Sequence, residues 1–401
     1  MAIALCLRTS TPRPGESHRA EGRHRTGVTG SFQSQVRPMA TRRTFLKSVG
    51  VSVVAAVLAS TGGLAYGEEP LKVGFVYVGP VGEAGWTYAH DLGRKELERA
   101  LGDKVKTTYI ESVPEGADAE RVIRQLAASG HKVIFTTSFG YMNQTLKVAQ
   151  SQPKVYFAHA TGYKTAKNVS TYEARTYEGA YLQGVVAGKV SKTGVLGVVA
   201  SYPIPEVIRN INAMTLGARS VNPNMKTKVV WVNTWYDPAK ERQAAEALIA
   251  QGADVLGQNT DSPAIVQTAE EKGVYAFGWD SDMSKFGPKA HLTGTTIQWG
   301  GYYIDTVKKV LAGAWDTHQI HWGMKEGMIA MAPLNPALPA DVVQLFEEKR
   351  QAIIDGTLKP FAGPIKDQSG ALKVAAGAEL PFDAMMSINW YVEGVEGSLP
   401  K

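Results

Sequence analysis

The chain has 401 residues, of which 44% are hydrophobic and 20% charged, a balance that excludes a disordered or fibrous protein and allows two domains with separate cores. The net charge of +6 comes from the first 67 residues, which hold nine Lys and Arg against two Asp and Glu. The remainder has 34 basic and 35 acidic residues, so nucleic acid and anionic membrane surfaces are not expected partners.

The N-terminal segment has the order of an export signal. The stretch "TRRTFLK" precedes a short apolar run and the small-residue sequence "LAYGEEP", and this order resembles a twin-arginine signal. The apolar run is shorter than the ~20 residues needed to span a bilayer, so no membrane anchor is expected. We expect translation to begin at Met39 and cleavage to follow Gly67, so that 1–67 is a leader removed on export to the periplasm. Chance pairing of Arg42 and Arg43 on an ordinary helix stays an alternative.

Cysteine usage agrees with an exported protein that has no lipid. Cys6 is the only cysteine, and it precedes the signal. The mature chain is therefore expected to have no disulfide, no thiolate metal site and no lipidated cysteine.

Short apolar runs alternate with helical patterns after the leader. Helix ends are legible in "DPAKERQAAEALIAQG", where Asp237 occupies the N-cap position, Pro238 the first helical position and Gly252 the position past the end. The runs predict eight strands, at 71–78, 104–110, 132–137, 154–160, 194–201, 228–235, 253–260 and 274–280.

This alternation predicts an α/β protein with parallel sheets covered by helices. A single barrel is an alternative, but the series pauses at 188–194 and restarts, and 293–303 is interpreted as a linker into another helix. We expect two doubly wound, Rossmann-like lobes joined by a hinge of several crossovers. The predicted first lobe comprises 70–192 and 297–321, and the predicted second lobe comprises 193–296 and 322–401.

Motifs for catalysis and cofactor binding are absent from the sequence. The glycines at 79, 82 and 85 have G-x-x-G-x-x-G spacing, which differs from the dinucleotide fingerprint. No zinc-binding histidine spacing and no G-x-S-x-G elbow occurs. We therefore expect no catalytic residues, no metal and no cofactor.

Aromatic residues gather just after predicted strands or at crossovers. Because ligands of open α/β sheets bind beyond the carboxyl ends of the strands, the pattern predicts a cleft lined for a flat ligand. Any one of these rings alone is better explained as core packing. The residues are Trp86, Phe139, Tyr141, Trp235, Tyr236, Trp279 and Trp299.

Polar residues at the same strand ends are candidates for specificity. Asp280 and Asp261 can accept hydrogen bonds from ring or exocyclic N–H groups, although Asp261 fits equally well as a helix N-cap. Asn210 can pair with two atoms of a purine edge.

Several of these pieces resemble the basic membrane protein family of substrate-binding proteins for ABC transporters, the group that contains purine nucleoside receptors. The resemblance covers nearly all of 71–335 and is carried by "EAGWTYAH", "YEGAYLQGVVAGKVSKTGVLGVV", "GARSVNPNMKTKVVWVNTWYDPAKERQAAEALIAQGADVL" and "EKGVYAFGWDSD". It implies a type I periplasmic binding fold, in which two lobes close on a ligand.

The resemblance also implies roles for single residues. Trp86 stands where the family stacks an aromatic on the base, followed by Thr87 in place of Asn, and Asp280 matches a carboxylate that holds ribose. Trp299 replaces a Lys that grips the sugar. Asn210 replaces an aromatic of the hinge helix, and His159 stands near an acidic position at the end of the fourth strand. The loss of sugar-gripping groups favours a free nucleobase such as adenine.

We therefore expect a monomeric binding protein that delivers a planar heterocycle to an inner-membrane ABC permease. A nucleoside-binding protein, an exported sensor domain and a nucleosidase-like enzyme are the alternatives. The expected ligand contacts are Trp86, Thr87, Phe139, Tyr141, His159, Asn210, Trp235, Asp261, Asp280 and Trp299.

Overall fold

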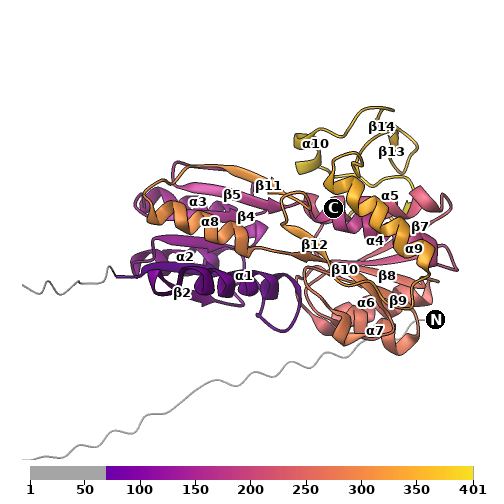
Figure 1. Ribbon diagram of the computed structural model, residues 1–401, viewed down its shortest axis with the longest axis horizontal. Helices are drawn as coiled ribbons and strands as arrows, with labels where there is room; N and C mark the ends of the chain where they lie inside the picture. Colours follow the sequence, from indigo (N-terminus) through magenta and orange to yellow (C-terminus); the bar gives the residue numbers. More distant parts are fainter. Residues whose placement is uncertain (1–68, 401) are drawn as a thin grey trace, which may run out of the picture. The chain divides into compact units, whose positions relative to one another are not determined.

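The computed structural model describes residues 69–400, so the predicted leader lies outside the described residues. Two mostly parallel sheets, each with its own helices, and a small two-stranded antiparallel sheet near the C-terminus make up this part of the chain (Figure 1). The α/β class predicted from the alternating pattern is confirmed.

The first sheet has the strand order β11-β5-β4-β3-β1-β2, and all its neighbours are parallel. Its side chains alternate between two faces, as the strand geometry requires. Val73 and Phe75 pack toward α1 and α8, whereas Val76 and Ile134 pack toward α2 and α3. We call this sheet with its four helices the first lobe. Its elements are β1 Leu71–Val76, α1 Gly85–Leu101, η1 Gly102–Lys104, β2 Val105–Ile110, α2 Ala117–Ala128, β3 Val133–Thr136, η2 Phe139–Tyr141, α3 Met142–Ser151, β4 Tyr156–Ala160, β5 Val169–Ala174, α8 Gly300–Leu311 and β11 Gln319–Trp322.

The second sheet has the order β12-β10-β9-β8-β6-β7-β15, and only its edge strand β12 is antiparallel to its neighbour among these described strands. In Figure 1, α6 and α7 lie below this sheet and α4, α5 and α9 lie above it. We call this sheet and the elements packed on it the second lobe. Its elements are α4 Thr176–Val190, β6 Val195–Ala200, α5 Pro205–Val221, β7 Lys226–Trp231, α6 Pro238–Ala250, β8 Val255–Asn259, α7 Ala264–Lys272, β9 Tyr275–Gly278, η3 Ser284–Phe286, β10 His291–Ile297, β12 Ile329–Met331, α9 Ala340–Ile354, β13 Ile365–Lys366, β14 Leu372–Val374, α10 Phe382–Met386 and β15 Val395–Glu396.

All eight predicted strands overlap observed ones, but two buried strands were missed. The segment 293–303, interpreted as a linker, contains β10 and the start of α8. Strand β5 also escaped prediction, because its buried face includes the polar residues Thr171 and Glu173. Buried polar side chains hide a strand from any reading of apolar runs.

The first crossing between the sheets also differs from expectation. The predicted first segment of the first lobe, 70–192, includes helix α4. In the structure α4 packs along α5 and on β10. The two helices approach closely because Gly184 and Gly217 leave no room for a side chain: a Cβ on Gly217 would come within 2.0 Å of the Tyr181 carbonyl oxygen. The chain therefore crosses after β5, and it crosses again after β10 and between β11 and β12.

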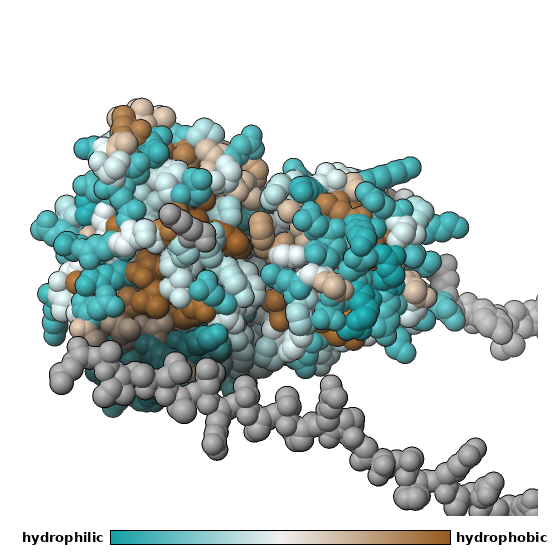
Figure 2. Space-filling model, turned by 180° about the vertical axis from the view of Figure 1, so that it is seen from behind, coloured by the Kyte–Doolittle hydropathy of each residue, from teal (hydrophilic) through white to brown (hydrophobic). Residues whose placement is uncertain are grey.

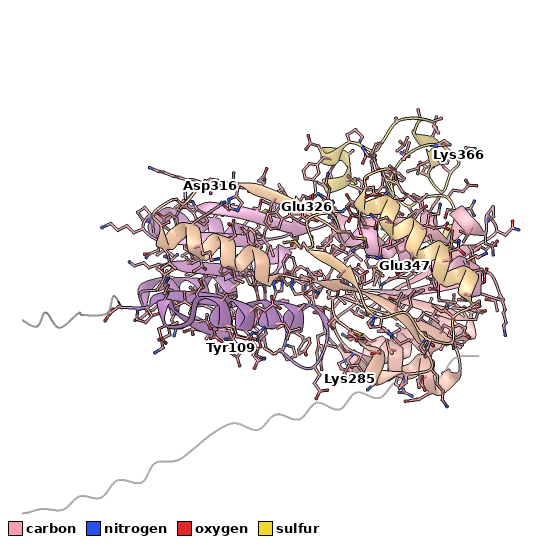
Figure 3. All side chains as sticks on the ribbon, viewed as in Figure 1. Tyr109, Lys285, Asp316, Glu326, Glu347 and Lys366 are labelled. Atoms are coloured by element: carbon pink, nitrogen blue, oxygen red, sulfur yellow. The ribbon has the colours of Figure 1, made fainter. Side chains whose placement is uncertain are left out.

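Ion pairs connect the crossing segments. Arg175, just after β5, donates to Glu178 and, at 2.6 Å, to Glu326 in the segment between β11 and β12. Glu326 is labelled in Figure 3, where it lies between the two sheets. The pair ties the first and third crossings to each other.

On the face shown in Figure 2, hydrophilic residues predominate and hydrophobic residues gather in several patches between them. Phe382 and Leu372, in the C-terminal segment, are among the exposed apolar side chains. No helix within 69–400 has both the length and the apolar character that crossing a membrane requires.

Candidate functional site

A cavity lies where the carboxyl ends of strands from both sheets meet. About 390 Å³ of space, part of it open to solvent, lies here between residues from β1, β3, β4 and α1 on one side and residues from β8, β9, α5 and the segment after β7 on the other. This is the place where open parallel sheets bind ligands, because their loops diverge there. The lining residues are Val78, Trp86, Ser138, Phe139, Thr161, Ile204, Glu206, Val207, Trp235, Asn259, Asp261, Trp279 and Asp280.

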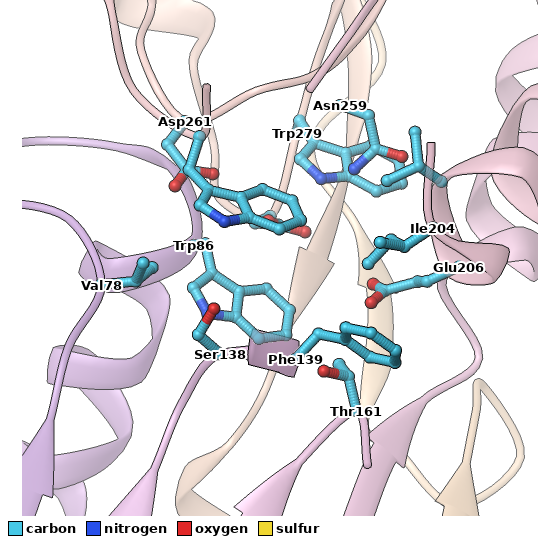
Figure 4. A pocket seen from close by; sticks show the side chains of 13 residues that line it. Val78, Trp86, Ser138, Phe139, Thr161, Ile204, Glu206, Asn259, Asp261 and Trp279 are labelled. Carbon is cyan, nitrogen blue, oxygen red and sulfur yellow. The ribbon is translucent and has the colours of Figure 1, made fainter. Parts of the chain in front are cut away.

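Trp86 begins its helix at the edge of this cavity. Gly85 and Trp86 open α1, and the indole Nε1 donates to the carbonyl oxygen of Thr137 at 2.6 Å. This bond fixes the ring while leaving it half-buried beside the cavity (Figure 4). A large apolar ring at the start of a helix is therefore held in place without being covered by the core.

Two further expected aromatics, Phe139 and Trp235, also line the cavity. Phe139 opens the short helix η2 after β3, and Trp235 follows β7 in the second lobe. The rings thus come from both lobes, as a ligand sandwiched between lobes requires. Trp279, which the sequence pattern grouped with these rings without assigning it a contact, lines the cavity as well.

Tyr141 and Trp299 do not line the cavity. Tyr141 is fully buried in the first lobe, and its hydroxyl donates to the carbonyl oxygen of Val113. Trp299 is 1% exposed and lies behind Trp86, with its ring stacked on His90 at a centroid distance of 4.5 Å and an angle of 10°. Both rings therefore pack in the core, which is the explanation that the sequence analysis gave for any single ring.

Thr87 and His159 are likewise withdrawn from the cavity. The hydroxyl of Thr87 accepts the backbone N–H of Gly79, which shapes the loop after β1. His159 is buried, with Nδ1 2.9 Å from the Thr136 hydroxyl, and burial lowers its pKa to about 3. The imidazole is therefore neutral at any physiological pH.

Asn210 does not line the cavity, but it is hydrogen-bonded to a residue that does. Its amide Nδ2 donates to Oδ1 of Asn259 at 3.1 Å, and its Oδ1 accepts the hydroxyl of Thr176 at 3.0 Å. Asn259, at the end of β8, is the amide that lines the cavity. Asn210 thus orients a lining side chain and is not itself part of the wall.

Asp261 and Asp280 line the cavity and are both buried. Asp237 caps α6 by accepting the Lys240 N–H at 3.1 Å, as predicted. Asp261, however, does not cap α7, because the N–H of Ala264 is accepted by the Ser262 hydroxyl instead. Burial is the main cause that raises the pKa of both cavity aspartates well above the usual range.

Glu206 is the main residue that the sequence analysis missed. It stands in the first turn of α5, directly after Pro205, and its carboxylate points into the cavity (Figure 4). Burial is the main cause that raises the pKa of Glu206 to about 8, and repulsion from the nearby Glu173 carboxylate is the second. A usable signal was present, since "YPIPEV" follows a strand and opens a helix at the carboxyl edge of a sheet.

Direct contacts join the two lobes at the cavity rim. The backbone N–H of Gly85 donates to the hydroxyl of Ser281 at 2.9 Å, and Lys285 pairs with Glu83 at 2.8 Å. Gly85 has φ +86°, and a Cβ there would come within 2.2 Å of the Asp261 carbonyl oxygen. The lobes therefore meet over the cavity through a position that only glycine fits.

Comparison with known proteins identifies the family. The family model described as "ABC transporter substrate-binding protein PnrA-like" matches residues 71–359. The chain belongs to this family.

Among curated relatives, a purine-binding protein of Brucella abortus is 54% identical over 340 residues, which cover 85% of this chain and 97% of the relative. A putative ABC transporter glucose-binding protein of Haloferax volcanii is 38% identical over 332 residues, covering 83% of this chain and 82% of the relative. The recognition of an ABC substrate-binding protein from sequence pieces is thus confirmed, and members of the family bind small molecules and work with a permease.

A solved structure supports the fold independently. The solute-binding protein of an ABC transporter system from Aeropyrum pernix matches with a TM-score of 0.64 at 20% identity, covering 79% of this chain and 95% of that chain. The predicted type I periplasmic binding fold is confirmed.

Proposed function

We propose that this substrate-binding protein captures a purine nucleobase, such as adenine, and delivers it to the permease of an ABC importer. The observation that carries the proposal is the set of four aromatic rings, Trp86, Phe139, Trp235 and Trp279, that line one cavity together with three carboxyl groups. The 54% identical relative is named as a purine-binding protein, which supports the same ligand class.

The energetics of such a site are sufficient for transport. Stacking of a base on an aromatic side chain contributes ~1–3 kcal/mol, and micromolar affinity requires about −8 kcal/mol. Two stacked faces plus hydrogen bonds to Asp261, Asp280 and Asn259 reach this range. No step needs catalysis, because capture and release suffice for delivery.

Closure of the lobes would supply the signal to the permease. The segments after β5, after β10 and between β11 and β12 connect the two sheets and would form the hinge. Contacts such as Gly85 N–H to Ser281 Oγ would form only when the lobes close over a ligand. A permease that binds the closed form would then distinguish loaded from empty protein.

Calorimetry with adenine, hypoxanthine, adenosine, inosine and glucose tests the ligand class. Purified protein is first unfolded and refolded to remove any retained cargo, and mass spectrometry identifies what is released. We expect bases to bind more tightly than their nucleosides. Tighter binding of nucleosides contradicts the nucleobase assignment, and a preference for glucose favours the sugar named for the Haloferax relative.

Two other parts of the proposal have their own tests. Turnover of a nucleoside by the purified protein would contradict a pure binding role.

Export to the periplasm by the twin-arginine route predicts that replacing both Arg42 and Arg43 by Lys leaves the precursor in the cytoplasm. Normal export of that double variant contradicts the proposed route.

A further inference from the structure

Three carboxyl groups face the same cavity from three separate elements. Glu206 comes from the first turn of α5, Asp261 from the segment after β8, and Asp280 from the segment after β9. The thirteen lining residues include no Lys, Arg or His. Because like charges at close quarters oppose each other's ionisation, a wall with three acids and no base favours the protonated, neutral form of its carboxyl groups.

Arg209 does not supply the missing positive charge. Its guanidinium forms a buried ion pair with Glu173 and donates to the carbonyl oxygen of Met385. Repulsion by Glu173 acts on Glu206 more strongly than attraction by Arg209 does. His321 lies beside Glu173, with its Nε2 3.9 Å from Oε1, and it is neutral because burial lowers its pKa to about 3. These neighbours on α5, β5 and β11 therefore leave Glu206 without a counter-charge.

Further acids lie behind the wall. Glu241, on α6, adds to the repulsion that opposes ionisation of Asp261, and Glu115 accepts a hydroxyl from the wall of the cavity. Asp261 and Glu206 in turn oppose ionisation of Asp280. Burial first, and this repulsion second, raise the pKa of Glu206 to about 8 and the pKa of both aspartates well above the usual range.

Two of the three carboxyl groups have oxygens that lack a hydrogen-bond partner. Oδ2 of Asp261 and Oδ1 of Asp280 are buried and have no partner among the described residues, and the two residues are 7% and 2% exposed. The indole Nε1 of Trp235, in the same wall, is also buried without a partner there. Buried polar atoms left unpaired are costly, so these three atoms are arranged for groups that a ligand brings.

The protonation state decides which ligand edge such a carboxyl group can pair with. A carboxylate only accepts hydrogen bonds, so it matches an edge with two N–H groups, whereas a neutral acid has an O–H donor beside a C=O acceptor. Adenine presents a ring nitrogen that accepts next to an amino group that donates, as at N7 and N6. A neutral acid and this edge can form two parallel hydrogen bonds.

We propose that Glu206, Asp261 and Asp280 act on the base as neutral carboxylic acids, so that the cavity selects rings whose edges pair an acceptor nitrogen with an N–H donor. This inference rests on the proposed function and states how that site recognises its base. Rings that offer only N–H donors, such as a planar amidinium, would need the ionised form instead.

The pH dependence of adenine affinity tests the neutral form. Adenine itself stays mostly uncharged in neutral and mildly alkaline buffer, so a change in affinity there reports on the protein. Only protonated Glu206 can donate, so affinity should be level below pH 7 and fall about tenfold by pH 9, as the pH passes the Glu206 pKa of about 8. Calorimetry at pH 6, 7, 8 and 9 measures this fall. Affinity that is constant or rises over the range overturns the proposal.

Paired substitutions separate hydrogen bonding from charge. Glu206→Gln, Asp261→Asn and Asp280→Asn keep a donor beside an acceptor in the same volume, so each should keep adenine affinity at pH 7 within about threefold of the unmodified protein. Glu206→Leu, Asp261→Leu and Asp280→Leu remove both groups, so each should lose about tenfold or more. Glu206→Gln should also remove the fall in affinity between pH 7 and pH 9, because its amide does not titrate.

Infrared difference spectroscopy observes the protons directly, without a ligand. The C=O band of protonated carboxyl groups should lose intensity in each of the three amide variants at pH 7. The control is Glu347→Gln, whose side chain is 48% exposed on α9 and is labelled in Figure 3. It replaces an exposed carboxyl group outside the cavity wall, so both the band and the adenine affinity should stay unchanged.

The outcomes distinguish this inference from the proposed function. If neither adenine nor hypoxanthine binds at any of these pH values, the proposed function is wrong and the inference falls with it. If adenine binds but the amide variants lose as much affinity as the leucine variants, or the infrared band is the same in all three amide variants as in the unmodified protein, only the neutral-acid pairing is overturned. Amide variants that keep their affinity beside leucine variants that lose it support the proposal.

Discussion

Trp86 and Trp299 meet edge to face, with ring centroids 5.4 Å apart and an interplanar angle of 79°. Trp86 lines the cavity, whereas Trp299 lies behind it and stacks on His90. One ring is thus exposed to a ligand and the other supports it from the core, although both follow the same kind of strand end in the sequence.

Replacement of the two tryptophans is expected to have different effects. Trp86→Ala should weaken purine binding by roughly 5- to 150-fold, corresponding to the loss of one stacking interaction. Trp299→Ala should lower the free energy of unfolding by about 3–5 kcal/mol, because it leaves a cavity in the core, and should weaken binding indirectly. Calorimetry and urea denaturation measure the two effects.

Trp315→Ala is the control for these variants, because Trp315 stacks on Tyr156 in the first lobe and does not line the cavity. It should leave affinity unchanged. If binding of every purine survives both Trp86→Ala and Trp299→Ala, the rings serve packing alone.

Gly85→Ala should impair closure of the lobes. The added methyl group would collide with the Asp261 backbone, and the positive φ adds strain. We expect affinity to fall at least about tenfold, mainly through faster ligand dissociation measured by stopped-flow fluorescence. Gly82→Ala is the matched control, since Gly82 also has a positive φ but its nearest neighbour, the Pro80 carbonyl oxygen, is 4.0 Å away. Equal losses in both variants would point to strain instead of closure.

The buried ion pair of Arg209 and Glu173 should dominate stability beside the hinge. Both residues are at most 4% exposed. Arg209→Met would leave the carboxylate of Glu173 buried and unpaired, which should cost about 3–5 kcal/mol of unfolding free energy. The double variant with Glu173→Gln should recover part of this loss in urea denaturation. No recovery would mean that the bond from Arg209 to Met385, and not the ion pair, carries the effect.

Glu206 should make stability depend on pH in a defined direction. Its pKa is raised from the ordinary 4.5 to about 8, so the folded protein holds a proton that the unfolded chain releases. Its contribution is therefore fully present below pH 4.5 and is lost as pH rises through 8. The charged groups that act on it are Glu173, which opposes ionisation, and Arg209, which favours it; Asp261 and Asp280 face the same cavity.

Urea denaturation between pH 5 and pH 9 tests this dependence. Over this range the free energy of unfolding of the unmodified protein should fall more steeply with pH than that of Glu206→Gln. The difference between the two slopes should be at most the slope that one released proton produces. Identical slopes in the two proteins would show that Glu206 is already ionised at pH 5.

Much of the architecture was determined by the sequence on its own. Apolar runs separated by capped helices predicted eight strands, because hydrophobic spacing and caps such as Asp237 are local features. The rule that ligands bind at carboxyl ends of strands placed Trp86, Phe139, Trp235, Asp261 and Asp280 near one another, and all five line the cavity.

Only the tertiary structure decided which way each side chain faces. Tyr141 and Trp299 follow strands just as Phe139 and Trp86 do, yet they pack into cores, because helix direction and neighbouring layers set their orientation. Glu206 reaches the cavity because α5 begins there, and β10 is a buried strand because it pairs with β9 and β12 and is covered by helix α4. Local sequence specifies elements through hydrophobic spacing, whereas a binding surface depends on contacts between segments that lie far apart in the chain.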